Sequence, residues 1–455
     1  MLRRNIFANF FGTGYVLLLQ FALLPIVLRY LGAEAFGLVG VYATLLAFAS
    51  IVDGGLAPAL GRELARLSVL DRGDELMRST VRTLETLCIA VAACTALFAW
   101  FAAPYVSIYW LNTSKLSSET TVFCLRMMGM QIAFQLLLAF YSGGLNGLQR
   151  MSLSNGINAV LNTLRSVGVL LVLLVLHLPA EAFFAWQALV TGLTALVMAI
   201  SLYRTLPAAG DGKFSQERFA ACWKYAAGMV GITLATVGLT QTDKLILSKL
   251  LSLEEFGYYT IATSIAGAIS RPASLIFAAI LPRMTQLYEA KDFSGLGNIY
   301  LKSSRLIAWL SIPCAGVFWA FHLPLLTLYF SSAAIASRVG PLVAIVGVGS
   351  ALNALMHTPY ALTLAYGWTG FAIRQNVIAT TLLVPSIYFG ATWYGPIGAA
   401  WAWLMLNAAY VLISVYLIHR KCLPDRLAAW YRLNALIVAV CVSIALILHC
   451  CFTAY

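Results

Sequence analysis

Apolar stretches of about 20 residues recur along the whole chain, and they leave little room for any fold other than a bundle of membrane helices. Such a stretch crosses the hydrocarbon core as one helix, because every backbone polar group must be hydrogen-bonded within the segment. Only 10% of the 455 residues are charged, whereas a soluble domain carries roughly a quarter. The sequence therefore predicts an all-α polytopic membrane protein.

The polar breaks between these stretches are short and predict about thirteen spans. The predicted spans are residues 6–30, 36–59, 84–108, 121–146, 156–177, 184–203, 225–248, 256–281, 304–323, 339–365, 376–393, 397–418 and 433–452. The first stretch is too long for a signal-peptide core, so we expect it to be retained. No connection exceeds about 25 residues, so we expect no attached catalytic domain. The sequence also contains no phosphate-loop, HExxH or GxSxG motif. We therefore expect that the protein is not an enzyme.

The placement of the basic residues predicts the orientation in the membrane. The formal net charge is +12, and about 21 of the 29 Lys and Arg residues lie in alternate loops or tails. The positive-inside rule then puts loops 61–82 and 419–426 and the N-terminus in the cytoplasm, and loop 112–119 outside. The basic excess therefore indicates topology and not nucleic-acid binding. The nine cysteines form no CxxC pair, and we expect no metal and no other cofactor.

Two copies of one motif indicate an internal duplication. LGAEAFGLV (31–39) and LSLEEFGYY (251–259) share Glu, Phe and Gly at an offset of 220 residues, and the same offset relates Gly147 to Gly367. Chance similarity between apolar sequences is the alternative. Six spans per copy predict two parallel six-helix lobes around a central cavity. The predicted division is an N-terminal lobe (1–205), a cytoplasmic linker (206–223) with a short amphipathic segment near 215–223, a C-terminal lobe (224–420) and one additional helix (421–455).

Ionisable residues inside the predicted spans are the candidates for function, because such a group is costly when it faces lipid. These residues are Arg29, Asp53, Arg126, Arg165, Asp243, Lys244 and Arg271. Apart from Arg29, which lies at a span edge, four cations face two carboxylates, and the interior is predicted to be net positive. Arg165 and Arg271 lie near mid-span, too far from an interface to reach water by snorkelling. Both therefore favour a hydrated cavity.

The other ionisable residues leave two interpretations open. Asp243 and Lys244 lie near a span end, where a structural pair and a binding role are equally compatible with the sequence. Arg126 also lies near an outer end and favours a structural role, whereas Arg29 either marks the membrane edge or gates the cavity. His357 is a candidate protonation switch. The candidates for ion coupling or charge pairing are Asp53, Asp243 and His357.

Polar residues continue from these charges along single helix faces. One stripe contains Asn155, Asn158, Asn162 and Arg165, and a second contains Thr233, Thr236, Thr240 and the Asp243–Lys244 pair. Such stripes either join helices or line a wet lumen, and their ending in a cation favours the lumen. Guanidinium groups there would bind a phosphate or diphosphate, while amides and hydroxyls suit sugar hydroxyls. Pro272 predicts a bend of its helix beside Arg271.

Residues 24–67 and 242–288, which contain the repeated motif, resemble bacterial polysaccharide flippases of the Wzx type in the MOP exporter superfamily. The most specific parts are LGAEAFG, DGGLAPALGRELA and LLSLEEFGYYTIA. The resemblance implies two six-helix lobes in a V, with alternating access to a central cationic cavity. It implies that an undecaprenyl-diphosphate-linked oligosaccharide moves across the bacterial inner membrane, driven by an ion gradient, for O-antigen, lipopolysaccharide or exopolysaccharide synthesis. By position it implies that Arg29, Lys244, Arg271 and Arg165 line that cavity.

The partners that the resemblance implies are the lipid-linked glycan, membrane lipids, and the polysaccharide polymerase with its chain-length machinery. The candidate substrate-binding residues are Arg29, Arg126, Asn158, Asn162, Arg165, Thr240, Lys244 and Arg271. The usual count in this family is twelve or fourteen helices, so the predicted thirteen leaves the C-terminal topology open. Two other functions remain open: a cation-coupled multidrug antiporter of the same superfamily, and an integral membrane glycosyltransferase or polymerase.

Overall fold

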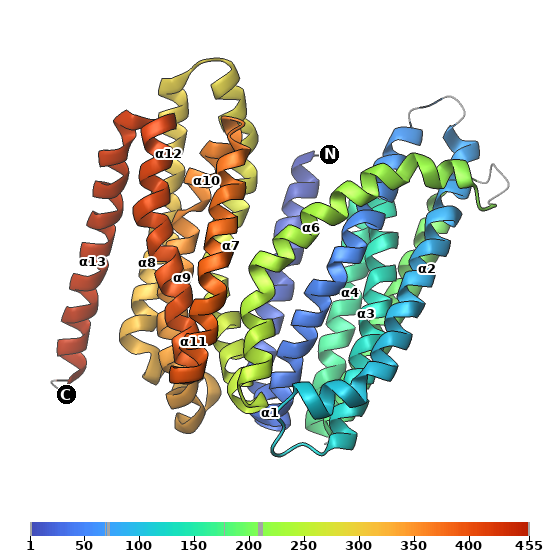
Figure 1. Cartoon of the computed structure of the whole chain (residues 1–455), viewed down its shortest axis with the longest axis horizontal. Helices are drawn as coiled ribbons and strands as arrows, with labels where there is room; N and C mark the ends of the chain where they lie inside the picture. The colour runs from blue at the N-terminus through green and yellow to red at the C-terminus, as the bar shows by residue number, and fades with distance from the viewer. Residues whose placement is uncertain (1, 69, 71–72, 177, 208–212, 454–455) are drawn as a thin grey trace. The chain divides into compact units, whose positions relative to one another are not determined.

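The computed structural model describes residues 2–68, 70, 73–176, 178–207 and 213–453, which are almost entirely helical (Figure 1). The α-helices are α1 (Leu2–Leu67), α2 (Gly73–Tyr105), α3 (Ser118–Gly147), α4 (Met151–Leu170), α5 (Ala180–Thr205), α6 (Gln216–Leu250), α7 (Leu253–Glu289), α8 (Phe293–Phe330), α9 (Ala333–Leu355), α10 (His357–Ala365), α11 (Thr369–Ala409), α12 (Val415–Cys422) and α13 (Leu427–Thr453). Single helical turns of other types are η1 (Val106–Trp110), η2 (Leu171–Val175), η3 (Tyr410–Ser414) and η4 (Pro424–Arg426). Within the described ranges there is no strand, only an isolated bridge between Asn112 and Ser252, and the predicted all-α class is confirmed.

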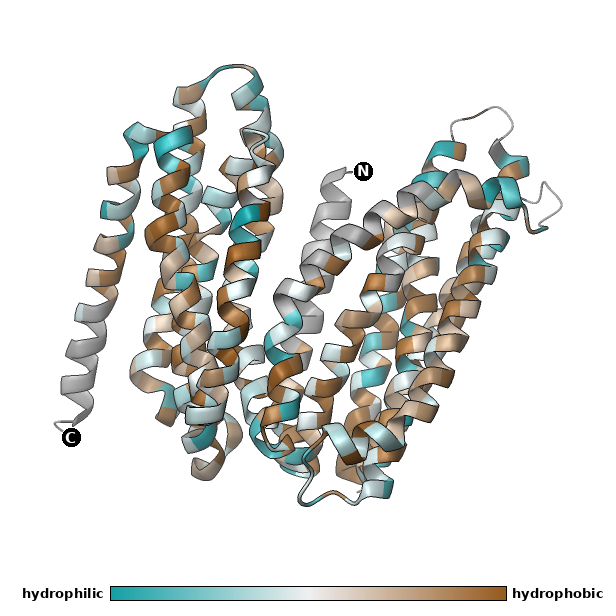
Figure 2. Cartoon of the chain, viewed as in Figure 1, coloured by the Kyte–Doolittle hydropathy of each residue, from teal (hydrophilic) through white to brown (hydrophobic). Residues whose placement is uncertain are grey.

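Nine helices in the described part of the chain are long and apolar enough to cross a membrane. Figure 2 shows that hydrophobic residues dominate the bodies of the helices, and that most strongly hydrophilic residues lie at helix ends and in connections. The chain is therefore a multi-pass membrane protein. The count of thirteen spans, with six in each lobe, stays a prediction.

Helices α1 and α11 each contain residues of two predicted spans, which are separated by a single residue with non-helical dihedral angles. The first two predicted spans both lie in α1, which is interrupted at Gly32, where φ is 79°. The predicted spans 376–393 and 397–418 both enter α11, which is interrupted at Gly395 (φ 61°) directly before Pro396. Glycine adopts a positive φ without the steric cost that other residues incur. A single glycine is therefore enough to turn the chain between consecutive apolar segments.

Several helices begin at a side chain that caps a free backbone N–H group. The capping residues are Ser117 for α3, Ser215 for α6, Asp292 for α8 and Ser332 for α9. An oxygen at this position accepts a hydrogen bond that the helix itself cannot provide. After its cap at Ser215, α6 continues without a break to Leu250. The amphipathic segment predicted near 215–223 is therefore the beginning of α6.

The chain divides into two compact units, Met1–Gly257 and Tyr258–Tyr455. Unit 1 has a hydrophobic core of side chains from α1, α2, α3 and α5, including Leu64, Leu84, Phe140 and Leu202. In this unit α1 and α3 approach closely, since a Cβ atom on Gly147 would overlap the backbone of Gly61 in α1. The core fixes α3 and α5, and α4 packs against α1 and α5.

Unit 2 has its own core, which includes Leu296, Tyr300, Leu355 and Trp430. Helices α8 and α9 pack together, and α13 packs against α8. Gly367, which the 220-residue offset relates to Gly147, follows α10 with a φ of 65°. Gly147 thus allows a close helix contact, whereas Gly367 ends a helix.

Candidate functional site

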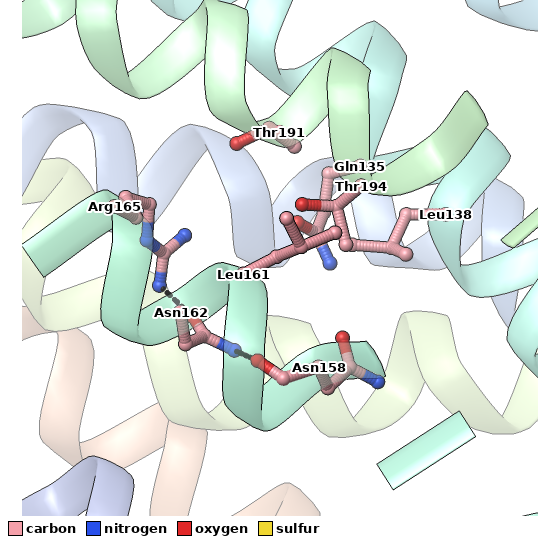
Figure 3. A pocket seen from close by; sticks show the side chains of 8 residues that line it. All are labelled: Gln135, Leu138, Asn158, Leu161, Asn162, Arg165, Thr191 and Thr194. Atoms are coloured by element: carbon pink, nitrogen blue, oxygen red, sulfur yellow. Dashed lines mark hydrogen bonds between the residues drawn. The ribbon is translucent and has the colours of Figure 1, made fainter. Parts of the chain in front are cut away.

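A polar cavity of about 220 Å³ lies among α3, α4 and α5 of unit 1 (Figure 3). Its described lining residues are Gln135 and Leu138 of α3, Asn158, Leu161, Asn162 and Arg165 of α4, and Thr191 and Thr194 of α5. Asn158, Asn162 and Arg165 share one face of α4 because they are separated by about one and two helical turns. The structure thus brings together three of the predicted substrate-binding residues. Asn155, the first residue of that predicted stripe, is not among those that line the cavity.

The Arg165 side chain is held along its own helix. Its Nη2 atom donates to Asn162 Oδ1 at 2.6 Å, and Asn162 Nδ2 donates to the Asn158 carbonyl oxygen at 2.8 Å (Figure 3). A guanidinium has five N–H donors, and one of them makes this bond. The side chain is half-buried, and the described lining residues include no carboxylate.

The backbone at Arg165 is fixed from the neighbouring helix α5. Trp186 Nε1 donates to the carbonyl oxygen of Arg165 at 3.0 Å. The indole lies so close to α4 that a Cβ atom on Gly168 would overlap it, which places α4 and α5 in tight contact one turn beyond Arg165. The position of the guanidinium is therefore set by the packing of two helices.

Apart from the Arg165 guanidinium, the polar groups of the cavity are neutral hydrogen-bond donors and acceptors. The side-chain hydroxyls of Thr191 and Thr194 donate to the carbonyl oxygens of Gln187 and Val190 at 2.7 and 2.6 Å. Their oxygen lone pairs remain available as acceptors. The amides of Gln135 and Asn158 also line the cavity, and each offers both donors and an acceptor. Such a lining suits an oxyanion at the guanidinium, flanked by hydroxyl groups.

Arg271, the other mid-span arginine, lies on α7 in unit 2. Its side chain is exposed, and among the described residues no carboxylate forms an ion pair with it. Helix α7 continues through Pro272. The bend expected beside Arg271 stays a prediction. The Ser274 hydroxyl donates to the carbonyl oxygen of Arg271 at 2.9 Å.

Three other predicted cations of unit 1 do not line the cavity. The Arg126 guanidinium lies 4.6 Å from the centre of the Trp100 ring, and its Nε atom donates to the Trp100 carbonyl oxygen at 3.4 Å. This cation–π contact between α3 and α2 supports the structural interpretation of Arg126. Arg29 is exposed on α1 shortly before the break at Gly32, and Lys244 is half-buried on α6.

The coupling candidates are described only in part. Asp243 is half-buried on α6. His357 is half-buried at the beginning of α10, where its Nδ1 atom lies 3.2 Å from the carbonyl oxygen of Asn353. The side chains of Asp53 and Thr240 lie outside the described residues.

Four polar residues that matter in unit 1 were not among the predicted site residues. Gln135, Thr191 and Thr194 line the cavity from α3 and α5. Buried Glu85 of α2 accepts hydrogen bonds from the Tyr141 and Tyr203 hydroxyls at 2.7 and 2.6 Å, and it pairs with an arginine on its own helix. Gln135, Thr191 and Thr194 are polar residues within apolar stretches, which is a signal for function in the sequence. Glu85 lies among other polar residues near the beginning of its helix, where the sequence gives no such signal.

Family models match both halves of the chain. A model described as polysaccharide biosynthesis protein matches residues 2–288, and a model described as MatE matches residues 229–389. A Shigella flexneri protein named for O-antigen transport is 20% identical over 419 residues, 92% of this chain and 98% of that protein. The succinoglycan biosynthesis transport protein ExoT of Rhizobium meliloti is 26% identical over 327 residues, 69% of this chain and 59% of that protein.

Solved structures share the fold at low sequence identity. A multidrug resistance MATE family transporter of the MOP superfamily, in an inward-facing conformation, aligns with a TM-score of 0.70 and 14% identity over 92% of this chain and 95% of that one. The lipid II flippase MurJ, in an inward closed conformation, aligns with a TM-score of 0.68 and 13% identity over 95% and 97% of the two chains.

Proposed function

Because the chain belongs to the polysaccharide biosynthesis protein family, we propose that it translocates an undecaprenyl-diphosphate-linked oligosaccharide across the inner membrane. The family membership confirms the resemblance of its motifs to polysaccharide flippases. The proposed cycle is alternating access, driven by an ion gradient, with the N-terminus in the cytoplasm. Support comes from a family model that covers most of the chain and from relatives named for O-antigen and succinoglycan transport.

One observation carries the proposal at the level of residues. Arg165 lies in a polar cavity inside a membrane helix bundle, with no acidic group among the described lining residues. A charged side chain inside a membrane helix bundle costs several kcal/mol unless water or a partner stabilises it, so such a residue is a candidate for function. An anionic ligand would supply the missing partner.

The chemistry of the cavity fits a glycan head group that carries phosphate. The free N–H groups of the Arg165 guanidinium would bind an oxyanion with two parallel hydrogen bonds. The Gln135 and Asn158 amides would contact sugar hydroxyls. Arg271, which is exposed on α7 of unit 2, is proposed as a substrate contact of its own.

The multidrug antiporter is the alternative that a specific observation favours, because the MatE model matches residues 229–389. A cationic drug would need a carboxylate to replace its hydration, and the described lining of the cavity has none. The cavity therefore favours an anionic substrate.

A deletion strain of the natural host tests the proposal. Loss of the gene should stop polymer export and leave lipid-linked oligosaccharide in the inner leaflet, where an external glycosidase cannot reach it. The wild-type gene should restore export, whereas Arg271→Ala should not, although the variant inserts in the membrane at normal abundance. Normal export in the deletion strain, combined with new sensitivity to cationic drugs, would exclude the flippase in favour of the antiporter.

A further inference from the structure

The end of unit 1 that contains residues 112–117 holds two distant segments of the chain together. We call these residues, which connect η1 to α3, the strap. On one side, the carboxylate of Glu34 in α1 accepts hydrogen bonds from the backbone N–H groups of Ser114 and Lys115, at 2.6 and 2.7 Å. Glu34 is only 4% exposed. Two charge-assisted bonds to a buried carboxylate fix the strap firmly to α1.

On its other side the strap contacts the junction between α6 and α7. Asn112 Nδ2 donates to the carbonyl oxygens of Lys249 and Leu251 at 3.1 and 3.4 Å. The Leu253 N–H group donates to the Asn112 carbonyl oxygen at 3.0 Å. Asn112 is exposed, whereas Leu251 and Leu253 are buried, so these bonds lie at the edge of the surface.

The two copies of the repeated motif meet at this joint through equivalent residues. A Cβ atom on Gly37 would overlap the carbonyl oxygen of Leu253, and a Cβ atom on Gly257 would overlap that of Ala33. The 220-residue offset relates Gly37 to Gly257 and Ala33 to Leu253, so the contact is reciprocal. The two glycines bring the backbones together, and the buried Leu253 side chain also lies against Gly37.

The two glutamates that the offset relates both bind the strap at Lys115, but with unequal strength. Glu34 accepts from its backbone, as described above. Glu254 forms an ion pair with its ammonium group, with 2.5 Å between Nζ and Oε2. That pair raises the pKa of Lys115, but its side chains are 69% and 28% exposed. Exposed pairs exchange readily with water and contribute little to stability.

We propose that the strap is a latch: it stays attached to α1 through Glu34, and it releases the α6–α7 junction during each transport cycle. This inference rests on the proposed transport function. The buried carboxylate is the permanent attachment, and the exposed Lys115–Glu254 pair with the Asn112 bonds is the attachment that opens. Gly37 and Gly257 have no side chains of their own at this contact, which favours separation of the segments.

A cross-link across the releasable side tests the latch. The two positions are related by the tips of long side chains, so a bis-methanethiosulfonate reagent is used to bridge Lys115→Cys and Glu254→Cys through two disulfides. Cross-linking should lower polymer export in the complemented deletion strain about tenfold or more, and a reductant should restore it. The matched control is Thr120→Cys with Glu181→Cys, since Thr120 Oγ1 donates to Glu181 Oε1 at 2.5 Å between α3 and α5 of the same unit. The same reagent should leave export by the control unchanged. Undiminished export by a fully cross-linked Lys115–Glu254 variant would overturn the proposal.

A second measurement needs no substrate and separates this inference from the proposed function. Spin labels at Ser118→Cys and Glu255→Cys, both exposed positions, report the distance between α3 and α7 in the full chain in lipid nanodiscs. Two distance populations are expected, and Glu254→Gln should enrich the longer one at least twofold. A single population that Glu254→Gln leaves unchanged would overturn the latch. Two populations in a protein that moves no lipid-linked glycan would retain the latch and reject the function.

Discussion

Replacement of Arg165 by Gln removes the cation of the unit 1 cavity and keeps a polar side chain of similar reach. Within the described part of the chain, the guanidinium donates one hydrogen bond, to Asn162, and four of its five donors remain for a ligand. If a substrate oxyanion takes two of the others, each charge-assisted bond contributes about 1.5 kcal/mol in this half-buried site, at the lower end of the usual range. Loss of both gives about 3 kcal/mol, or roughly a hundredfold lower apparent affinity. Arg165→Lys keeps the charge and one bond, so the loss should be about tenfold.

The assay is the rate of translocation by purified variants in proteoliposomes at subsaturating lipid-linked substrate. Arg126→Gln is the matched control, because that guanidinium stacks on Trp100 and does not line the cavity. It should translocate within about twofold of wild type. Thermal unfolding of Arg165→Gln should stay close to wild type, since among the described residues the guanidinium bonds to Asn162 of its own helix. Equal losses in the Arg165 and Arg126 variants would refute the reasoning, as would an Arg165→Gln rate equal to wild type.

Two predictions concern stability. Glu85→Leu leaves two tyrosine hydroxyls and an arginine without their acceptor, so it should lower the unfolding free energy by about 3 kcal/mol, whereas Tyr141→Phe removes one bond and should cost about 1 kcal/mol. Equal melting temperatures for the two variants in detergent would contradict this. The Arg66 guanidinium holds the pKa of the Glu63 carboxyl below its ordinary range, so the pair stabilises the fold above that range, and the effect is lost as the pH falls through the lowered pKa. Arg66→Gln should therefore destabilise by about 0.5 kcal/mol at pH 7, and a difference that persists at acidic pH, where Glu63 is protonated, would contradict the assignment.

The face of α4 could be predicted from the sequence because it depends on local geometry. Asn158, Asn162 and Arg165 share a face of any helix that contains them. The residues that complete the cavity, Gln135 and Thr191 among them, lie on other helices. Nothing in the local pattern states which helices become neighbours, so these residues could not be assigned. The same limit applies to the Trp100 partner of Arg126, which comes from α2.

The repeat was the more informative part of the sequence for the fold. The 220-residue offset relates Gly37 to Gly257, and the structure shows that both glycines lie at the contact between the two copies. The pattern alone does not predict that the copies are in contact. Proline does not end the helix here, since α7 continues through Pro272.

The central claim is that this chain moves a lipid-linked diphosphate glycan, and that Arg165 of the cavity and exposed Arg271 bind it. The most direct test reconstitutes the full chain in proteoliposomes containing undecaprenyl diphosphate that carries a fluorescent oligosaccharide. Fluorophore exposed on the other leaflet is followed with a membrane-impermeant quencher under an imposed ion gradient. The account predicts translocation well above that of protein-free vesicles, and loss of most of it in Arg165→Gln and Arg271→Ala. Translocation no faster than in protein-free vesicles, by a correctly folded and inserted chain, would contradict it.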